Sequence, residues 1–155
     1  MDEFQLERIL NYRRISEKIA TAGQPSEGQL LAISESGFEI VINLGLENRE
    51  YSLSDEKALV ESLGLKYVHI PVEWEKPTPQ DFQKFISIVK RNKDRNLFIH
   101  CAANKRVSVF VALYRIFEWG WPREAALLAV REIWEPNEIW KHFVLDILEH
   151  GASSG

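Results

Sequence analysis

Apolar and polar positions along the chain form two kinds of segment that alternate. Three short apolar runs rich in β-branched residues, 39–44, 67–72 and 96–100, predict buried strands. Segments with a helical spacing of apolar residues separate these runs. Strands that alternate with helices predict an α/β fold, here a single domain whose central, mostly parallel sheet has four or five strands and is flanked by helices. A further short strand or two near residues 15–22 is expected at the edge of the sheet.

The expected helices carry signals at their ends. One helix covers residues 26–36, and Ser54 is the expected N-cap of the next. Thr78, Pro79 and Asp81 follow the N-cap, N1 and N3 order of a third helix.

The last third of the chain is predicted to be helical. Residues 106–118 are apolar nearly all round, which is typical of a helix buried against a sheet. Two more helices are expected to begin at Pro122 and Asn137. Four tryptophans of this region are expected to be core and helix-packing residues: Trp119, Trp121, Trp134 and Trp140.

Composition narrows the classes of function. The 155 residues suffice for one domain, expected over residues 1–150, with 151–155 as a flexible tail. The net charge of −4 gives no general attraction to nucleic acid or anionic membranes, and no apolar run approaches about 18 residues, so no membrane span is expected. A single cysteine excludes an internal disulfide and suits a reducing compartment, and no signal peptide is evident, so a cytoplasmic protein is expected. The histidines are scattered, and neither a metal site nor a cofactor is expected.

The most informative segment is 97–108, where a short apolar run ends at Cys101 and a buried helical pattern soon follows. This order predicts a strand, a tight loop and a helix, with a thiol at the carboxyl end of the strand. The N-terminus of a helix has unpaired N–H groups and a positive dipole end, which bind anions and stabilise a thiolate. We therefore expect a nucleophilic thiol at an oxyanion site.

The same segment supports a family resemblance. His100-Cys101, the small Ala103 and Ser108 before a buried helix resemble the signature of cysteine-dependent protein tyrosine and dual-specificity phosphatases, which is His-Cys, five residues, Arg, then Ser or Thr. Residues 15–25 and 37–44 are similar to a bacterial subgroup of phosphatase-like domains related to the domain fused to β-lactamase-like hydrolases. The resemblance covers about residues 15 to 119.

The resemblance implies roles for individual residues. Cys101 is the expected nucleophile, His100 supports its loop from behind, and the Ser108 hydroxyl is expected to hydrogen-bond the thiolate. Asn104 stands where the family usually has Gly, at a position that often needs a positive φ, and Asn tolerates that conformation best among the other residues. Gln24 is a further supporting residue. The phosphate-binding loop is expected to be Cys101, Ala102, Ala103, Asn104, Lys105, Arg106 and Val107.

Two groups depart from the family pattern. Val107 stands where the phosphate-binding Arg is usual, and Arg106 comes one residue early. Either the loop is one residue shorter and Arg106 turns inward, or Val107 packs inward and Arg106 points with Lys105 to solvent; the apolar helix favours Val107 inside. A bidentate Arg–phosphate pair is strong, so this choice decides how active the site can be.

The general acid is displaced as well. By the resemblance, the usual Asp position falls near Trp74 in the loop that follows the strand 67–72. Glu75 is the first choice for the acid and Glu73 the second, whereas Asp81 is better explained as a helix N3 residue.

Three functions follow. The first is a phosphatase that hydrolyses a phosphate monoester, on a phosphorylated protein or a small phosphate ester, through a thiophosphate intermediate on Cys101. The second is a weak or inactive pseudophosphatase that binds phosphoryl groups. The third is a rhodanese-type sulfurtransferase, whose active loop also begins at cysteine and often has four residues before an arginine, as between Cys101 and Arg106.

Overall fold

The computed structural model describes residues 3–151 and contains a five-stranded sheet of order β1-β2-β5-β3-β4. β2, β5, β3 and β4 run parallel, and β1 is antiparallel to β2, which confirms the mostly parallel α/β sheet. The strands are β1 (Arg13–Arg14), β2 (Ile19–Ala22), β3 (Ile40–Asn43), β4 (Lys66–His69) and β5 (Leu97–His100).

The sequence predicts one or two short strands near residues 15–22 at the edge of the sheet, and this prediction is correct only in part. The two-residue strand β1 is the edge, whereas β2 lies between β1 and β5. All four residues of β2 are buried, because the strand is covered on both faces and hydrogen-bonded on both sides.

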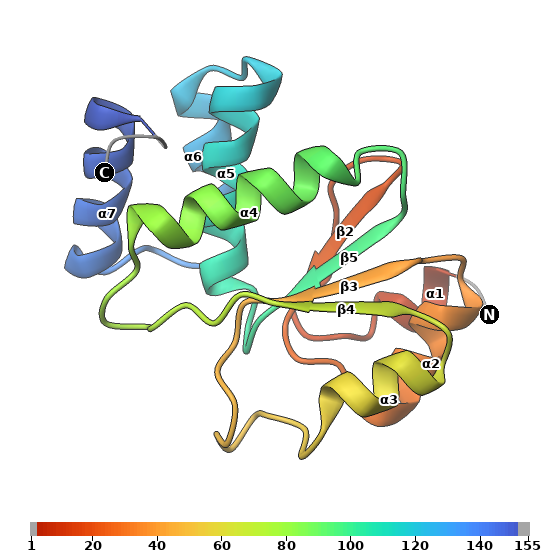
Figure 1. Ribbon diagram of the computed structural model, residues 1–155. Helices are drawn as coiled ribbons and strands as arrows, with labels where there is room; N and C mark the ends of the chain where they lie inside the picture. The colour runs from red at the N-terminus through yellow and green to blue at the C-terminus, as the bar shows by residue number, and fades with distance from the viewer. Residues whose placement is uncertain (1–2, 152–155) are drawn as a thin grey trace.

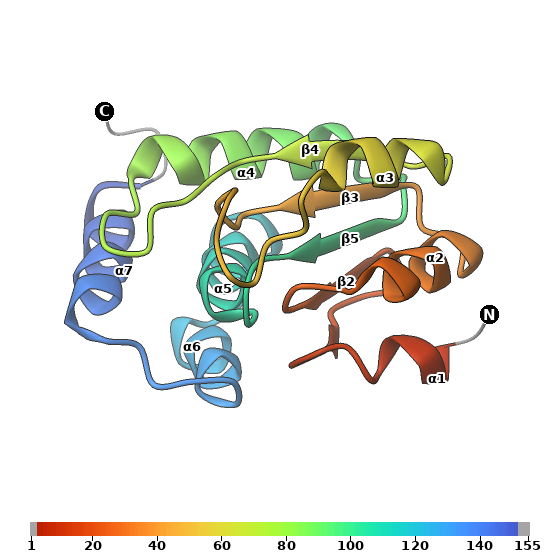
Figure 2. The ribbon, with the colours of Figure 1, turned by 90° about the horizontal axis from the view of Figure 1, so that it is seen from below.

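Helices cover both faces of the sheet (Figure 1). Alternate residues of one strand face opposite sides, so Ile40 and Ile42 join one core cluster and Val41 the other. The face of Val41 is covered by α1 (Glu3–Leu6), α2 (Glu27–Glu35) and α3 (Glu56–Ser62). The opposite face carries α4 (Pro79–Arg91) and α5 (Lys105–Trp119), with α6 (Arg123–Arg131) and α7 (Glu138–His150) packed against α5 (Figure 2).

Most helix ends agree with their sequence signals. Thr78 and Asp81 form a capping box at the start of α4, and the Asn137 side chain accepts from the backbone N–H of Trp140 at the start of α7. The expected cap at Ser54 is wrong by one residue, because the Asp55 carboxylate accepts from the Ala58 N–H instead. Both carboxylate and hydroxyl side chains cap well, so the sequence did not distinguish them.

The long helix α5 is the centre of the larger core cluster. Phe110 packs edge-on against Phe82 and Phe85, and stacks on Phe143 of α7. The prediction for the tryptophans is confirmed: Trp140 is fully buried, Trp121 and Trp134 pack partly buried against the same cluster, and Trp119, 41% exposed at the end of α5, packs edge-on against Tyr114.

The sequence also predicts a flexible tail at residues 151–155 and no membrane-spanning helix. Residues 152–155 of the expected tail lie outside the described residues. Across residues 3–151, no helix combines the length and apolar character that a bilayer crossing requires.

Candidate active site

The site is built where the parallel strands end. The carboxyl ends of the parallel strands β2, β3, β4 and β5 all lie at the same end of the sheet, so the segments that follow these strands converge there (Figure 2). Cys101 follows β5 directly and is fully buried. This confirms the predicted order of strand, Cys101, short loop and helix.

Asn104 holds the loop after Cys101 in its turn. Its φ of 64° is left-handed, as the sequence predicted for a position where Gly is usual. Its Nδ2 donates to the carbonyl of Asn11 at 2.8 Å and to the hydroxyl of Thr21 at 3.1 Å. Asn11 returns a bond from its own Nδ2 to the carbonyl of Ala103 at 3.0 Å. Sequence reasoning missed Asn11, because a reciprocal pair separated by 93 positions leaves no local signal.

Gly23 allows the segment after β2 to approach this loop. A Cβ atom on Gly23 would lie 2.6 Å from the carbonyl oxygen of Ala102 and 3.0 Å from the Cα of Ala103. The next residue, Gln24, donates its backbone N–H to that same carbonyl of Ala102 at 2.9 Å. Any side chain at position 23 would therefore push the loop out of place.

The N-terminus of α5 has no side-chain cap. Side chains cap α2, α3, α4 and α7, whereas Asn104 at the start of α5 makes no capping bond. The first N–H groups of a helix have no partner within the helix, and the helix dipole places positive charge there. The backbone beside Cys101 is therefore suited to bind an anion.

Arg106 and Val107 are both buried. Val107 packs inward as predicted, but Arg106 does not point to solvent, so the two side chains are not alternatives. The side chain of Val107 is fully inside the core, and Arg106 is only 6% exposed. The guanidinium carbon of Arg106 lies 5.4 Å from the ring centroid of Trp74 and 6.0 Å from that of Tyr51. Its Nε is buried without a hydrogen-bond partner among the described residues. A buried cation with an unused donor is a group that an oxyanion would complete.

His100 and Gln24 belong to one buried network with Glu56. The His100 Nε2 lies 2.5 Å from a carboxylate oxygen of Glu56, and Gln24 donates to the other oxygen at 2.8 Å. The His100 Nδ1 faces the carbonyl of Cys101 at 3.2 Å. Burial alone would raise the pKa of Glu56, but the bonds from His100 and Gln24 outweigh burial and lower it. The sequence analysis identified His100 and Gln24 as supporting residues and did not identify Glu56.

The expected bond from Ser108 to the Cys101 thiolate is absent from the hydrogen bonds of the described residues. The Ser108 hydroxyl donates to the carbonyl of Lys105 at 2.7 Å and accepts from the Trp134 Nε1 at 3.1 Å. Ser108 lies two residues after Arg106, so the helix turns it to the other side of the loop. Lys105 is half-buried, with its ammonium 5.7 Å from the Trp134 ring.

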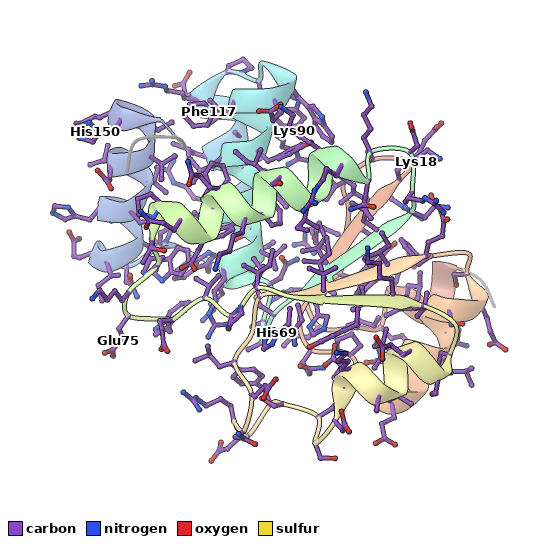
Figure 3. The ribbon with its side chains drawn as sticks, in the orientation of Figure 1. Lys18, His69, Glu75, Lys90, Phe117 and His150 are labelled. Carbon is purple, nitrogen blue, oxygen red and sulfur yellow. The ribbon has the colours of Figure 1, made fainter. Side chains whose placement is uncertain are left out.

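The segment after β4 brings an aromatic ring to the site and leaves its carboxylates outside. Trp74 packs on Trp134 and Trp140, and its carbonyl accepts from the Trp140 Nε1 at 2.9 Å. Glu73 and Glu75 are both exposed. Figure 3 shows Glu75 at the outer bend of this segment. Asp81 is the N3 residue of α4 and is occupied by its capping box, as predicted.

The turn after β3 also lies close to Cys101. A Cβ atom on Gly45 would lie 3.7 Å from the Cα of Cys101. The His69 Nε2, at the end of β4 (Figure 3), donates to the carbonyl of Gly45 at 2.6 Å, and the Asn43 Oδ1 accepts from the Gly45 N–H at 2.7 Å. Asn43 also donates to the hydroxyl of Tyr67, whose burial raises its pKa to about 12. In the described part of the chain, no cluster of His, Cys, Asp and Glu is arranged to hold a metal ion.

The model of a family described as "DSP-PTPase phosphatase fused to NAD+ Kinase" matches residues 10–131. No curated protein matches the chain. The matched family is one of phosphatases, so this match gives no support to the sulfurtransferase alternative.

Solved structures share this fold. A DUF442 protein from Shewanella putrefaciens CN-32, described as a candidate phosphatase, is 26% identical with a TM-score of 0.87, over 96% of this chain and 97% of that chain. A Cys-to-Ser variant of P. aeruginosa TpbA in complex with phosphotyrosine is 16% identical with a TM-score of 0.73, over 94% and 92% of the two chains. The core catalytic domain of the PP-IP phosphatase SIW14 from S. cerevisiae, in complex with citrate, is 15% identical with a TM-score of 0.74, over 88% and 85%.

Proposed function

Because this chain belongs to the family "DSP-PTPase phosphatase fused to NAD+ Kinase", among the cysteine-dependent phosphatases of the protein tyrosine and dual-specificity type, we propose that it hydrolyses phosphate monoesters with Cys101 as the nucleophile. One observation carries the proposal. A short loop joins the thiol to a helix whose N-terminus has no side-chain cap, and the first turn of that helix holds the buried Arg106 with an unpartnered Nε.

The reaction proceeds in two displacements at phosphorus. The Cys101 thiolate attacks, so that a phosphorus–sulfur bond forms while the bond from phosphorus to the ester oxygen breaks and the alcohol leaves with a proton. A water molecule then attacks the same phosphorus, the phosphorus–sulfur bond breaks, and inorganic phosphate leaves as the thiolate returns. A covalent intermediate of this kind divides one difficult step into two easier ones.

The loop and Arg106 hold the phosphoryl oxygens during both steps. The backbone N–H groups at the start of α5 point at the negative charge, and Arg106 supplies charge-assisted hydrogen bonds. Trp74 and Tyr51 lie beside the guanidinium and restrict its position. Donors fixed before the reaction stabilise the transition state without reorganisation, which is the largest electrostatic contribution in many enzymes.

Glu73 is the proposed donor of the proton to the leaving alcohol, ahead of Glu75. Val72, the residue before Glu73, still donates its N–H to the carbonyl of Leu44 at 3.1 Å, which holds this part of the chain at the edge where the site lies. Glu75 lies at the outer bend of the segment (Figure 3). Substrates of the proposed enzyme are phosphorylated proteins or small phosphate esters, and a cytoplasmic location remains a prediction.

The test is the release of phosphate from an aryl phosphate at mildly acidic pH. We expect Cys101→Ser to abolish turnover and Glu73→Gln to reduce kcat by about 10²–10⁴, the usual contribution of a general acid. Glu75→Gln is the matched control and should retain activity. Equal activity of the wild type and Cys101→Ser would remove the proposal, and a loss with Glu75→Gln alone would transfer the acid role to Glu75.

A binding module is the second candidate, and Ser108 favours it. The hydroxyl that would assist departure of the thiolate is bonded to Lys105 and Trp134 instead. A module of this kind would bind a phosphopeptide through the same loop without turnover. Saturable phosphate binding that depends on Arg106, with no phosphate release, would support this candidate over the enzyme.

A further inference from the structure

A second cavity lies behind the loop of Cys101, between the sheet edge and the last helices. Its volume is about 350 Å³, within the range of about 300–1,000 Å³ that is usual for small-molecule sites. β1, β2, α5 and α6 all contribute to its lining. It is separate from the candidate active site, because its α5 residues Ser108 and Arg115 lie about 160° and 180° around the helix from Arg106.

Three arginines, Arg13, Arg14 and Arg115, line the cavity and give it positive charge. Arg115 is 9% exposed and its Nε is buried without a hydrogen-bond partner. Arg13 donates to the backbone carbonyls of Tyr12 at 2.9 Å and Glu132 at 3.4 Å. Among residues 3–151, the guanidinium of neither Arg115 nor Arg13 forms an ion pair within 4 Å with a carboxylate. The Glu132 side chain also lines the cavity and is its only described carboxylate.

Apolar side chains form much of the remaining lining and suit an organic body. The guanidinium carbon of Arg115 lies 4.1 Å from the ring centroid of Trp121. Val111, Leu128, Ala129 and other small or aliphatic side chains form the wall. Burial lowers the pKa of Arg115, with Glu132 opposing this change, so the site carries a desolvated cation that an anion would stabilise.

We propose that this cavity is a second binding site, for a small organic anion whose carboxylate or phosphate group pairs with Arg115 and Arg13 and whose apolar body lies against Trp121 and α6. Guanidinium groups bind both kinds of oxyanion in the same forked geometry, so the two head groups share one chemistry.

The floor of the cavity connects it to the loop of Cys101. Thr21 lines the cavity and accepts from the Asn104 side chain at 3.1 Å. Ser108 also lines it and donates to the carbonyl of Lys105 at 2.7 Å. An anion bound here contacts the residues that fix the left-handed turn and the start of α5, so it changes the rate of hydrolysis. This effect on rate rests on the proposed function, whereas the binding itself does not.

The binding is tested by two-dimensional NMR titration with benzoate and phenylphosphonate, which place a carboxylate and a phosphonate on one ring. We expect saturable shifts of the Val111 and Ala129 amides at concentrations up to about 10 mM. Arg115→Met should weaken the binding about 10- to 100-fold, as expected for a lost charge-assisted bond. Ala129→Phe, which fills the cavity, should abolish it even if Arg115→Met is unstable. The head group that binds more tightly identifies the class of natural ligand.

Two control variants separate this site from the others. Arg123→Met removes a matched charge from an exposed position on α6 and should leave binding unchanged. Arg106→Met should remove only the phosphonate that binds at the loop of Cys101. Shifts that survive Ala129→Phe but vanish in Arg106→Met, or no shifts at Val111 and Ala129, would overturn the second site.

The effect on rate is tested separately in the wild type and in Ala129→Phe. Benzoate should change the hydrolysis rate of an aryl phosphate in the wild type and not in Ala129→Phe, whose basal rate should be unchanged. Binding without any change in rate would overturn the coupling and keep the site. A chain that binds benzoate but hydrolyses no phosphate ester would overturn the proposed function and support the site.

Discussion

Arg106 and Val107 are neighbours whose side chains serve different surroundings. A helix turns by about 100° per residue, so two consecutive side chains point in different directions and meet different surroundings. Val107 takes the core position, and Arg106 lies between Trp74 and Tyr51 at the edge of the sheet. We therefore infer that a loop with only four residues between Cys101 and the arginine is long enough to present a guanidinium to the candidate site.

Loss of the Arg106 guanidinium should reduce kcat/KM. Arg106→Met should lower kcat/KM for an aryl phosphate by about 10²–10³, the cost of one preorganised transition-state donor. The control is Arg91→Met, which removes an exposed arginine at the end of α4 and should change little. A ratio within about threefold of the wild type for Arg106→Met would contradict the assigned role.

Asn104 contributes both a backbone conformation and two hydrogen bonds, and substitutions separate these contributions. Asn104→Gly keeps the left-handed φ but loses the bonds to Asn11 and Thr21. Asn104→Ala loses both, so its free energy of unfolding should fall by about 1–2 kcal/mol more than that of Asn104→Gly. Urea unfolding of the two variants measures the difference, and a more stable Ala variant would contradict the strain argument.

At the scale of elements, a contact between two buried side chains joins the first turn of α3 to the end of β5. Glu56 begins α3, and its carboxylate contacts His100, the last residue of β5. This pair fixes the direction in which the chain leaves β5 and enters the loop of Cys101. Removal of one partner leaves the other group buried without its hydrogen bond, which costs about 1–3 kcal/mol.

The pKa of Glu56 predicts how stability changes with pH. The folded-state pKa lies below the ordinary value of 4.5, so the unfolded state binds more protons as the pH falls. The contribution of Glu56 is complete above pH 4.5 and is lost as the pH falls through the folded-state pKa. Glu56→Gln should flatten the dependence of the unfolding free energy on pH in this range.

Glu39 is the control for this pH dependence, because its pKa is lowered as well, by the backbone N–H of Asn96 and by Arg95. The Glu39 side chain is 39% exposed, so solvent screens its interactions and Glu39→Gln should remove only a small part of the slope. An unchanged slope in Glu56→Gln, measured by denaturant unfolding at several pH values, would contradict the role of the Glu56–His100 pair.

At the scale of the whole molecule, the features that could be predicted from the sequence are those that depend on residues close together along the chain. Periodicity and caps predicted the sheet, the long helices and the position of Cys101, because each depends on neighbouring residues. Asn11, Tyr51 and Glu56 escaped prediction, because they reach the site through contacts between distant segments. The partners of Ser108 were also missed, since a hydroxyl on a helix has several acceptors within reach and the tertiary packing of Trp134 selects one.

The covalent intermediate is the central claim, and acid-quenched mass spectrometry tests it most directly. The protein is mixed with an aryl phosphate, quenched during turnover and digested, and the peptide that contains Cys101 is weighed. The account predicts the added mass of one phosphoryl group on Cys101 in the wild type and none in Cys101→Ser. Phosphate release with no phosphoryl group on Cys101 at any quench time, or undiminished release by Cys101→Ser, would contradict it.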